Sequence, residues 1–170
     1  MEKKELQGLA EELRGFHLPR YAELTDVGLY LEQTTEYING ILRPLGCVEL
    51  TGSMIRNYVK KGLVANPVKK RYSADQIAHL ICIAVLKQVL SLENLGILIE
   101  RKSRLYDNPT AYNYFCTELE NALFFRFGLT DVLRDSGVTV SVEKEMLQSA
   151  ITAVSHEIYL TACFRRLSGA

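Results

Sequence analysis

The chain has 170 residues, a formal net charge of zero and a hydrophobic content of 48%. This content excludes a disordered chain, and the length allows one domain or two small ones. Zero net charge also argues against a protein that coats nucleic acid through bulk positive charge. The sequence has no apolar stretch long enough to span a membrane and no signal-peptide pattern at its start, so we expect a cytoplasmic protein.

Positive charge is concentrated in one segment of this neutral chain. Between Glu49 and Asp75 there is no acidic residue. The basic residues of the segment are Arg56, Lys60, Lys61, Lys69, Lys70 and Arg71. A run of like charge is most often only a solvated face, so its meaning depends on the elements that carry it.

Residues 1–28 are predicted to form an N-terminal arm. Leu6, Leu9 and Leu13 recur at helical spacing and indicate a short amphipathic helix, which ends before Pro19. A longer helix is expected over residues 29–42. Its apolar positions are Leu31, Ile38, Ile41 and Leu42, with Tyr30 and Tyr37, and the pattern ends at Pro44 and Gly46.

A short helix over residues 52–61 is indicated by signals at both of its ends. Thr51 is a suitable N-cap, Leu50 and Ile55 fit a hydrophobic staple, and Gly62 fits the position after the C-cap. Its buried stripe is expected to contain Ile55, Tyr58 and Val59. Its outer face, at spacings of three and four, contains Ser53, Arg56, Asn57 and Lys60.

A turn at residues 65–67 is predicted to lead into a short hairpin or loop over 68–72, which carries Lys69, Lys70 and Arg71. Tyr72 is expected to anchor this hairpin. Ser73 and Gln76 then form a capping box for a helix that runs to about Leu90.

Ser91 caps the next helix, whose apolar positions are Leu92, Leu95, Leu98 and Ile99. Its last turn contains basic residues that suit the negative end of the helix dipole. Part of this second basic cluster is therefore explained without a ligand. These residues are Arg101, Lys102 and Arg104.

The remaining sequence predicts an aromatic-rich helix and a long terminal helix. Asn108 as N-cap with Pro109 at the first helical position starts a helix that runs to Phe127 and is stopped by Gly128. Its aromatic residues are expected in the core or in a subunit contact, with a pocket for an apolar effector as the alternative.

A short helix near 131–134 and a turn at Gly137 should follow. Ser141 can then cap a helix that continues to about Leu167 and spans roughly 39 Å. Its apolar stripe could pack on the same chain or on a partner.

Motifs for catalysis or metal binding are missing from the sequence. The histidines are His17, His79 and His156, and none lies in a metalloprotease pattern, a P-loop or a nucleophile motif. The cysteines Cys47, Cys82, Cys116 and Cys163 are too widely spaced for a zinc set and are expected to be reduced thiols. We therefore expect no enzyme, no catalytic residue, no cofactor and no metal.

The stretch MIRNYVKKGLV resembles the recognition helix of regulators of the mercury-resistance (MerR) type. The matching residues are Ile55, Arg56, Tyr58, Gly62 and Leu63, whereas Met54, Asn57 and Val59 depart from the usual pattern. The stretches LPRYAELTDVGLYLEQ and PVKKRYSADQIAHLICIAVLKQVLSLENL, together with this one, are similar to the uncharacterised bacterial family known as domain of unknown function 1836. This resemblance implies a winged-helix fold but no known ligand or target.

These observations predict an all-α protein with a MerR-like winged helix-turn-helix and a short wing, followed by a C-terminal helical bundle. We expect an arm at 1–28, the DNA-binding unit at 29–106, and a region for dimerisation or an effector at 107–170. Its expected partners are duplex DNA and a second copy bound through the C-terminal helices, and its expected function is that of a bacterial transcriptional regulator. The alternative is a winged-helix module that binds another protein. The predicted DNA-facing residues are Ser53, Arg56, Asn57, Lys60, Lys61, Lys69, Lys70 and Arg71.

Overall fold

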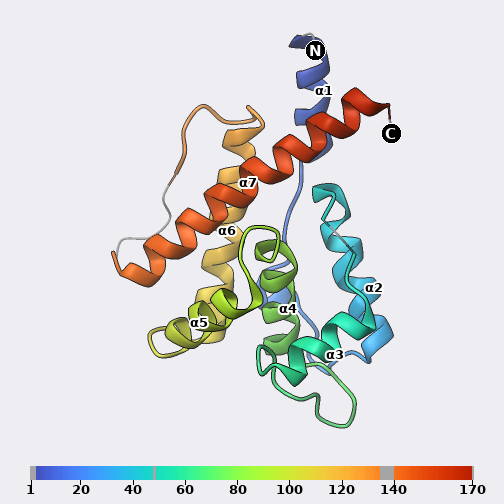
Figure 1. The fold of residues 1–170 in the computed structure, drawn as a ribbon, viewed down its shortest axis with the longest axis vertical. Coiled ribbons are helices and arrows are strands. Elements are labelled where there is room, and N and C mark those ends of the chain that lie inside the picture. Colours follow the sequence, from blue (N-terminus) through green and yellow to red (C-terminus); the bar gives the residue numbers. More distant parts are fainter. Residues whose placement is uncertain (1–2, 48, 135–139, 170) are drawn as a thin grey trace.

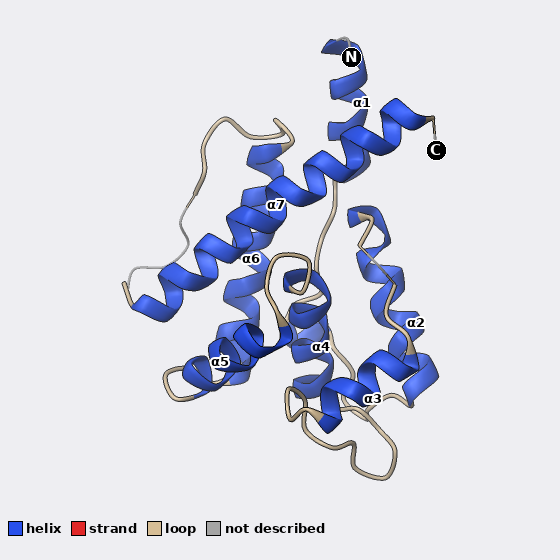
Figure 2. Ribbon diagram, in the orientation of Figure 1, coloured by secondary structure: helices blue, strands red, loops and turns tan. Residues whose placement is uncertain are grey.

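The computed structural model describes residues 3–47, 49–134 and 140–169. Within these ranges the chain is mainly helical and has no β-strand (Figure 2), which confirms the all-α class. Its helices are α1 (Lys3–Leu13), α2 (Leu31–Leu42), α3 (Gly52–Lys60), α4 (Ala74–Leu86), α5 (Leu92–Ser103), α6 (Asn108–Arg126) and α7 (Val142–Ser168), with 3-10 helices η1 (Tyr21–Glu23) and η2 (Arg43–Leu45). None of the described helices combines the length and apolar character needed to cross a bilayer.

Helix α4 is the central element of the core. It packs against α2, α6 and α7 (Figure 1), and Ile77, Leu80 and Ile81 have no exposed surface. A helix that is covered on most sides must be apolar around most of its circumference, which explains the nearly continuous apolar sequence here. One cluster of buried side chains extends from Leu9 in α1 to Cys163 in α7.

Helix α7 packs along α6 in the same chain. The inner stripe of α7 includes the buried residues Ile151, Val154 and Ile158. At the end of α6, the rings of Phe127 and Tyr159 meet edge to face with their centroids 5.2 Å apart. Part of the aromatic side chains of this region therefore belongs to the core, as predicted. Within the described chain, no other element covers the opposite face of α7.

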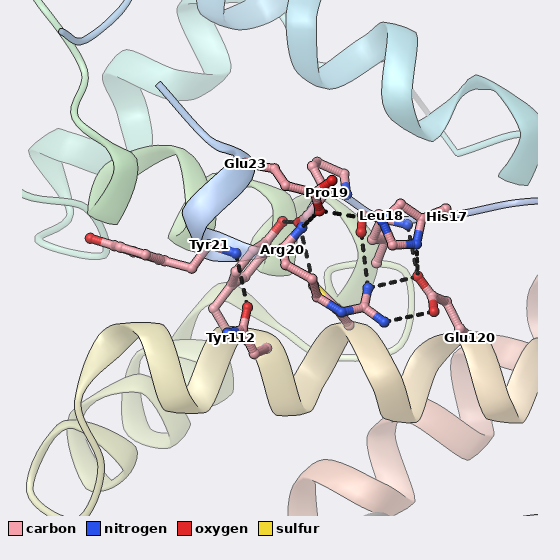
Figure 3. Close-up of polar contacts among 10 residues, drawn as sticks. His17, Leu18, Pro19, Arg20, Tyr21, Glu23, Tyr112 and Glu120 are labelled. Carbon is pink, nitrogen blue, oxygen red and sulfur yellow. Dashed lines mark hydrogen bonds and ion pairs between the residues drawn. The ribbon is translucent and has the colours of Figure 1, made fainter. Parts of the chain in front are cut away.

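The segment between α1 and α2 is fixed to α6 by polar contacts (Figure 3). The Glu120 carboxylate accepts hydrogen bonds from the Leu18 backbone N–H and from both terminal nitrogens of Arg20, each at 2.8 Å. The hydroxyl of Tyr112 donates to the Pro19 carbonyl at 2.8 Å. Leu18 is fully buried, so the C-terminal half of the predicted arm packs against the helical body.

Two predicted helix boundaries are wrong because other hydrogen bonds replace those of a longer helix. Helix α2 starts at Leu31, since Leu29 is in extended backbone and exchanges two hydrogen bonds with Tyr72, at 2.9 and 2.7 Å. Helix α4 ends at Leu86 and not near Leu90. There the Gln88 side chain donates to the Val85 carbonyl at 2.9 Å, in place of the next helical N–H.

The predictions around α6 need two further corrections. Its N-cap is Asp107 and not Asn108, because the Asp107 carboxylate accepts from the Thr110 N–H at 2.8 Å. The short helix predicted at 131–134 is absent from the structure. Val132 and Leu133 are 65% and 54% exposed, and a single turn without apolar burial is not stable. The turn predicted at Gly137 lies outside the described residues.

Candidate nucleic-acid interface

Helix α3 is held in place from both ends. At its start, Thr51 accepts a hydrogen bond from the Met54 N–H at 3.2 Å, as the sequence predicts. The side chain of Asn39 in α2 also bonds both backbone groups of Leu50, at 2.8 and 2.9 Å. This second anchor joins α2 to α3 across residues 43–50, and the sequence analysis did not predict it.

The end of α3 is a Schellman motif. Gly62 has a left-handed φ of 76°, the Gly62 N–H donates to the Val59 carbonyl, and the Leu63 N–H donates to the Tyr58 carbonyl, both at 3.0 Å. A side chain at residue 62 would be strained in this backbone, so glycine is required here. The chain consequently turns away sharply after Lys61 and leaves the last turn of α3 accessible.

The two faces of α3 divide as predicted, except that Val59, expected in the buried stripe, is only partly buried. Ile55 and Tyr58 are buried at 0% and 3% exposure. The outer face holds the exposed residues Ser53, Arg56, Asn57 and Lys60, and Lys61 is exposed at the C-cap. Across the described residues, no carboxylate forms an ion pair with Arg56, Lys60 or Lys61. These cations and the Asn57 amide therefore face solvent together.

The predicted hairpin at 68–72 is a tight two-residue turn. Val68 and Arg71 exchange backbone hydrogen bonds of 3.0 and 3.2 Å, and the central residues Lys69 and Lys70 have positive φ values of 50° and 63°. Positive φ at both central positions matches a type I′ turn. Residues other than Gly, Asn and Asp adopt this backbone conformation at a cost in free energy. The turn therefore projects two lysines into solvent from a strained backbone.

Arg71 has a structural role that the sequence analysis missed. Its guanidinium donates to the Val27 carbonyl at 3.3 Å and to the Tyr30 hydroxyl at 3.2 Å, and it lies 4.9 Å from the centre of the Tyr30 ring. Arg71 is nevertheless exposed. It fixes the turn against the start of α2 while its charge stays at the surface.

The turn and α3 lie at the same end of the molecule (Figure 1). Burial raises the pKa of Tyr72, and the positive charge of Arg56 partly opposes this rise. Burial also raises the pKa of Tyr58, whose hydroxyl accepts from the Lys87 ammonium at 3.4 Å. Tyr58 and Tyr72 are only 3% and 4% exposed, so both belong to the core below this surface, as predicted.

We name this surface the basic face and define it by the exposed side chains of α3 and of the turn. Its members are Ser53, Arg56, Asn57, Lys60, Lys61, Lys69, Lys70 and Arg71. It has amide, hydroxyl and cationic donors, which suit an anionic polymer with polar edges. Elsewhere in the described ranges, no group of three or more His, Cys, Asp or Glu side chains is arranged to hold a metal ion.

Comparison with known proteins gives one family match. Residues 19–115 match the model described as Domain of unknown function (DUF1836). The matched region includes the basic face, helices α2 to α5 and the first part of α6. No curated protein and no solved structure shows a significant match to the chain.

Proposed function

The chain belongs to this family of domains of unknown function, and we propose that it is a sequence-specific DNA-binding protein that regulates transcription in bacteria. In this proposal α2, α3 and the 68–71 turn form a winged helix-turn-helix similar to that of MerR-type regulators. The observation that carries the proposal is the basic face: cations on one side of a short, firmly capped helix, next to a turn that projects two more. Among the residues that the structure describes, no carboxylate is paired with the cations of this helix.

Helix α3 has the properties of a recognition helix. The major groove of B-DNA is about 12 Å wide and admits an α-helix. Asn57 can pair with the adenine edge, and Arg56 can pair with the guanine edge or a phosphate. Ser53 and Lys60, one turn to either side on the same face, would complete the contact.

The 68–71 turn serves as the wing in this proposal. Lys69 and Lys70 would neutralise phosphates beside the groove, which adds affinity without sequence information. Arg71 would share in that contact while it keeps the turn in place through Tyr30.

We also propose a two-fold dimer through α7, because DNA-binding units of this size usually read two half-sites. The outer face of α7 has exposed apolar residues at helical spacing, and these are Val142, Met146, Ala153, Leu160, Phe164 and Leu167. An antiparallel pair of α7 helices would bury this apolar face of both copies.

Sedimentation velocity at micromolar concentration tests the dimer. We expect a dimer for the wild type and a monomer for Leu160→Glu/Phe164→Glu, because the charges would be buried without partners. The control Val27→Glu/Leu105→Glu places the same charges at exposed apolar positions outside α7 and should stay dimeric. A monomeric wild type, or a dimeric α7 variant, would contradict the arrangement.

Fluorescence anisotropy with labelled duplex DNA tests the function. We expect wild-type binding to weaken steeply between ~50 and ~200 mM salt, and Arg56→Ala/Lys60→Ala to bind roughly tenfold more weakly with a salt slope reduced by about two. Arg14→Ala/Arg104→Ala removes the same net charge from two exposed ion pairs and should bind like the wild type. A duplex selected from a random library should bind about a thousandfold more tightly than random DNA.

Two outcomes would reject the proposal. Equal losses in both double variants would mean that net charge alone drives binding. No binding at ~50 mM salt would favour the alternative, in which the basic face binds an acidic protein.

A further inference from the structure

A second feature of the molecule, away from the basic face, is an apolar pocket of about 210 Å³ that is bordered by α4, α5, α6 and the start of α7 and is partly open to solvent. Its apolar walls include Ile83, Leu95, Ile99, Phe115 and Leu147. A cavity of about 150 Å³ with similar walls accepts benzene, so this space is large enough for a small apolar molecule.

One side of the pocket is polar and positively charged. Lys102, His79 and Asn108 line it together, with the Lys102 ammonium 2.9 Å from the Asn108 amide oxygen and 3.4 Å from His79 Nε2. Within the described chain, no carboxylate lies in ion-pair contact with Lys102. Its two contacts are with neutral or titratable side chains, so this cation lacks a full counter-charge.

The carboxylates nearest to this cation are engaged elsewhere. Asp75 accepts from the Tyr21 hydroxyl at 2.6 Å, and Asp107 caps α6. Glu143, at the α7 wall of the pocket, is paired with Arg101 at 2.6 Å. The pocket lining also includes Lys144, whose ammonium lies 5.3 Å from the centre of the Tyr114 ring. An incoming anion beside His79 and Asn108 would meet Lys102 as the nearest cation, with the acidic groups already bonded to their own partners.

We propose that this pocket binds a small apolar carboxylic acid, with the apolar body between α4, α5 and α6 and the carboxylate on Lys102 Nζ and the Asn108 side-chain amide. Charge complementarity at one end and apolar walls at the other together define an amphipathic monoanion. Burial lowers the pKa of Lys102, so its ammonium is poorly solvated and would gain from an anionic partner. Such binding would add a ligand site to the chain whether or not the basic face binds DNA.

Isothermal titration calorimetry of the full chain with octanoate and with octan-1-ol tests the proposal, since these probes differ in the charged head and share the apolar tail. We expect saturable one-to-one binding of octanoate that is at least about tenfold tighter than that of the alcohol. Lys102→Met should remove this preference while it keeps alcohol binding, because the methionine preserves an apolar stem. Lys102→Arg should retain a preference for the acid.

Two further variants complete the design. Ala111→Leu adds bulk to the pocket lining and should weaken both probes, and Arg104→Met removes a neighbouring cation that does not line the pocket and should weaken neither. The proposal is overturned if octanoate shows no saturable binding, if acid and alcohol bind equally to the wild type, or if Lys102→Met binds octanoate like the wild type. DNA is absent from the experiment, so its result is independent of the proposed function.

Discussion

The segment around Arg20 and the outer face of α3 use similar cations in opposite ways. Both terminal nitrogens of Arg20 are bonded to Glu120, whose side chain is only 12% exposed. Arg56 and Lys60 lie on the exposed face of α3, and within the described chain they have no carboxylate partner. In a chain of zero net charge, this difference separates the charges that hold the fold from those that remain available to an outside anion.

Removal of the Glu120 charge should give the largest effect on the anchored side of this comparison. We expect Glu120→Gln to lower the free energy of unfolding by about 2 to 3 kcal/mol, since Arg20 and the Leu18 N–H would lose a charged acceptor in a partly buried site. Denaturant unfolding followed by circular dichroism measures this change. Glu100→Gln, in an exposed pair with Arg104, is the matched control and should change stability little.

DNA affinity of folded Glu120→Gln should equal that of the wild type. An unchanged stability would show that the Glu120 contacts do not anchor the segment. A selective loss of DNA affinity would show that the two regions are not separate in function.

The second prediction concerns the 68–71 turn, where one double variant should raise the stability of the protein and lower its affinity for DNA. Lys69→Asn/Lys70→Gly places favoured residues at the two positive-φ positions of the turn, so we expect the free energy of unfolding to rise by up to about 1 kcal/mol. Loss of two cations should weaken DNA binding several-fold and reduce the salt slope.

Chemical denaturation and anisotropy on the same samples measure both effects. Equal DNA affinity in the variant and the wild type would remove the turn from the proposed interface. A lower stability would show that the lysines themselves support the turn.

The smallest effect is expected where a cation is exposed and already paired. Arg14 forms an exposed pair with Glu11, and both side chains are more than half exposed. Arg14→Ala should therefore leave thermal unfolding and DNA affinity nearly unchanged. A marked loss in either measurement would mean that an ion pair seen in the structure does not show which cations are unavailable to an outside anion.

Local features of the fold were predictable from the sequence because their physical causes are local. Thr51 and Gly62 mark the ends of α3 by capping chemistry, and the spacing of Ile55 and Tyr58 sets its buried face. Ser91 and Ser141 cap α5 and α7 in the same way. The positions of the basic face follow from these signals, whereas its binding to DNA stays a prediction.

Contacts between distant parts of the chain were not predictable. Arg20 and Glu120 are a hundred residues apart, and no local pattern relates them. The bond of Arg71 to Tyr30 and the Leu29–Tyr72 pairing also depend on tertiary structure, and the second of these shortens α2. Asp107 and Asn108 are both good N-caps, and only the position of the Thr110 N–H decides between them.

The most direct test of the proposed DNA-binding surface is a titration of the ¹⁵N-labelled protein with a selected duplex. A ¹H–¹⁵N correlation spectrum at each step maps the contact between protein and DNA residue by residue. We predict that amide shifts concentrate at residues 52–61 and 68–71, with residues 17–20 and the Glu120 region unchanged. Shifts that concentrate on α6 or α7, or no shifts at a concentration where the duplex should be bound, would contradict the assignment of the basic face as the DNA-binding surface.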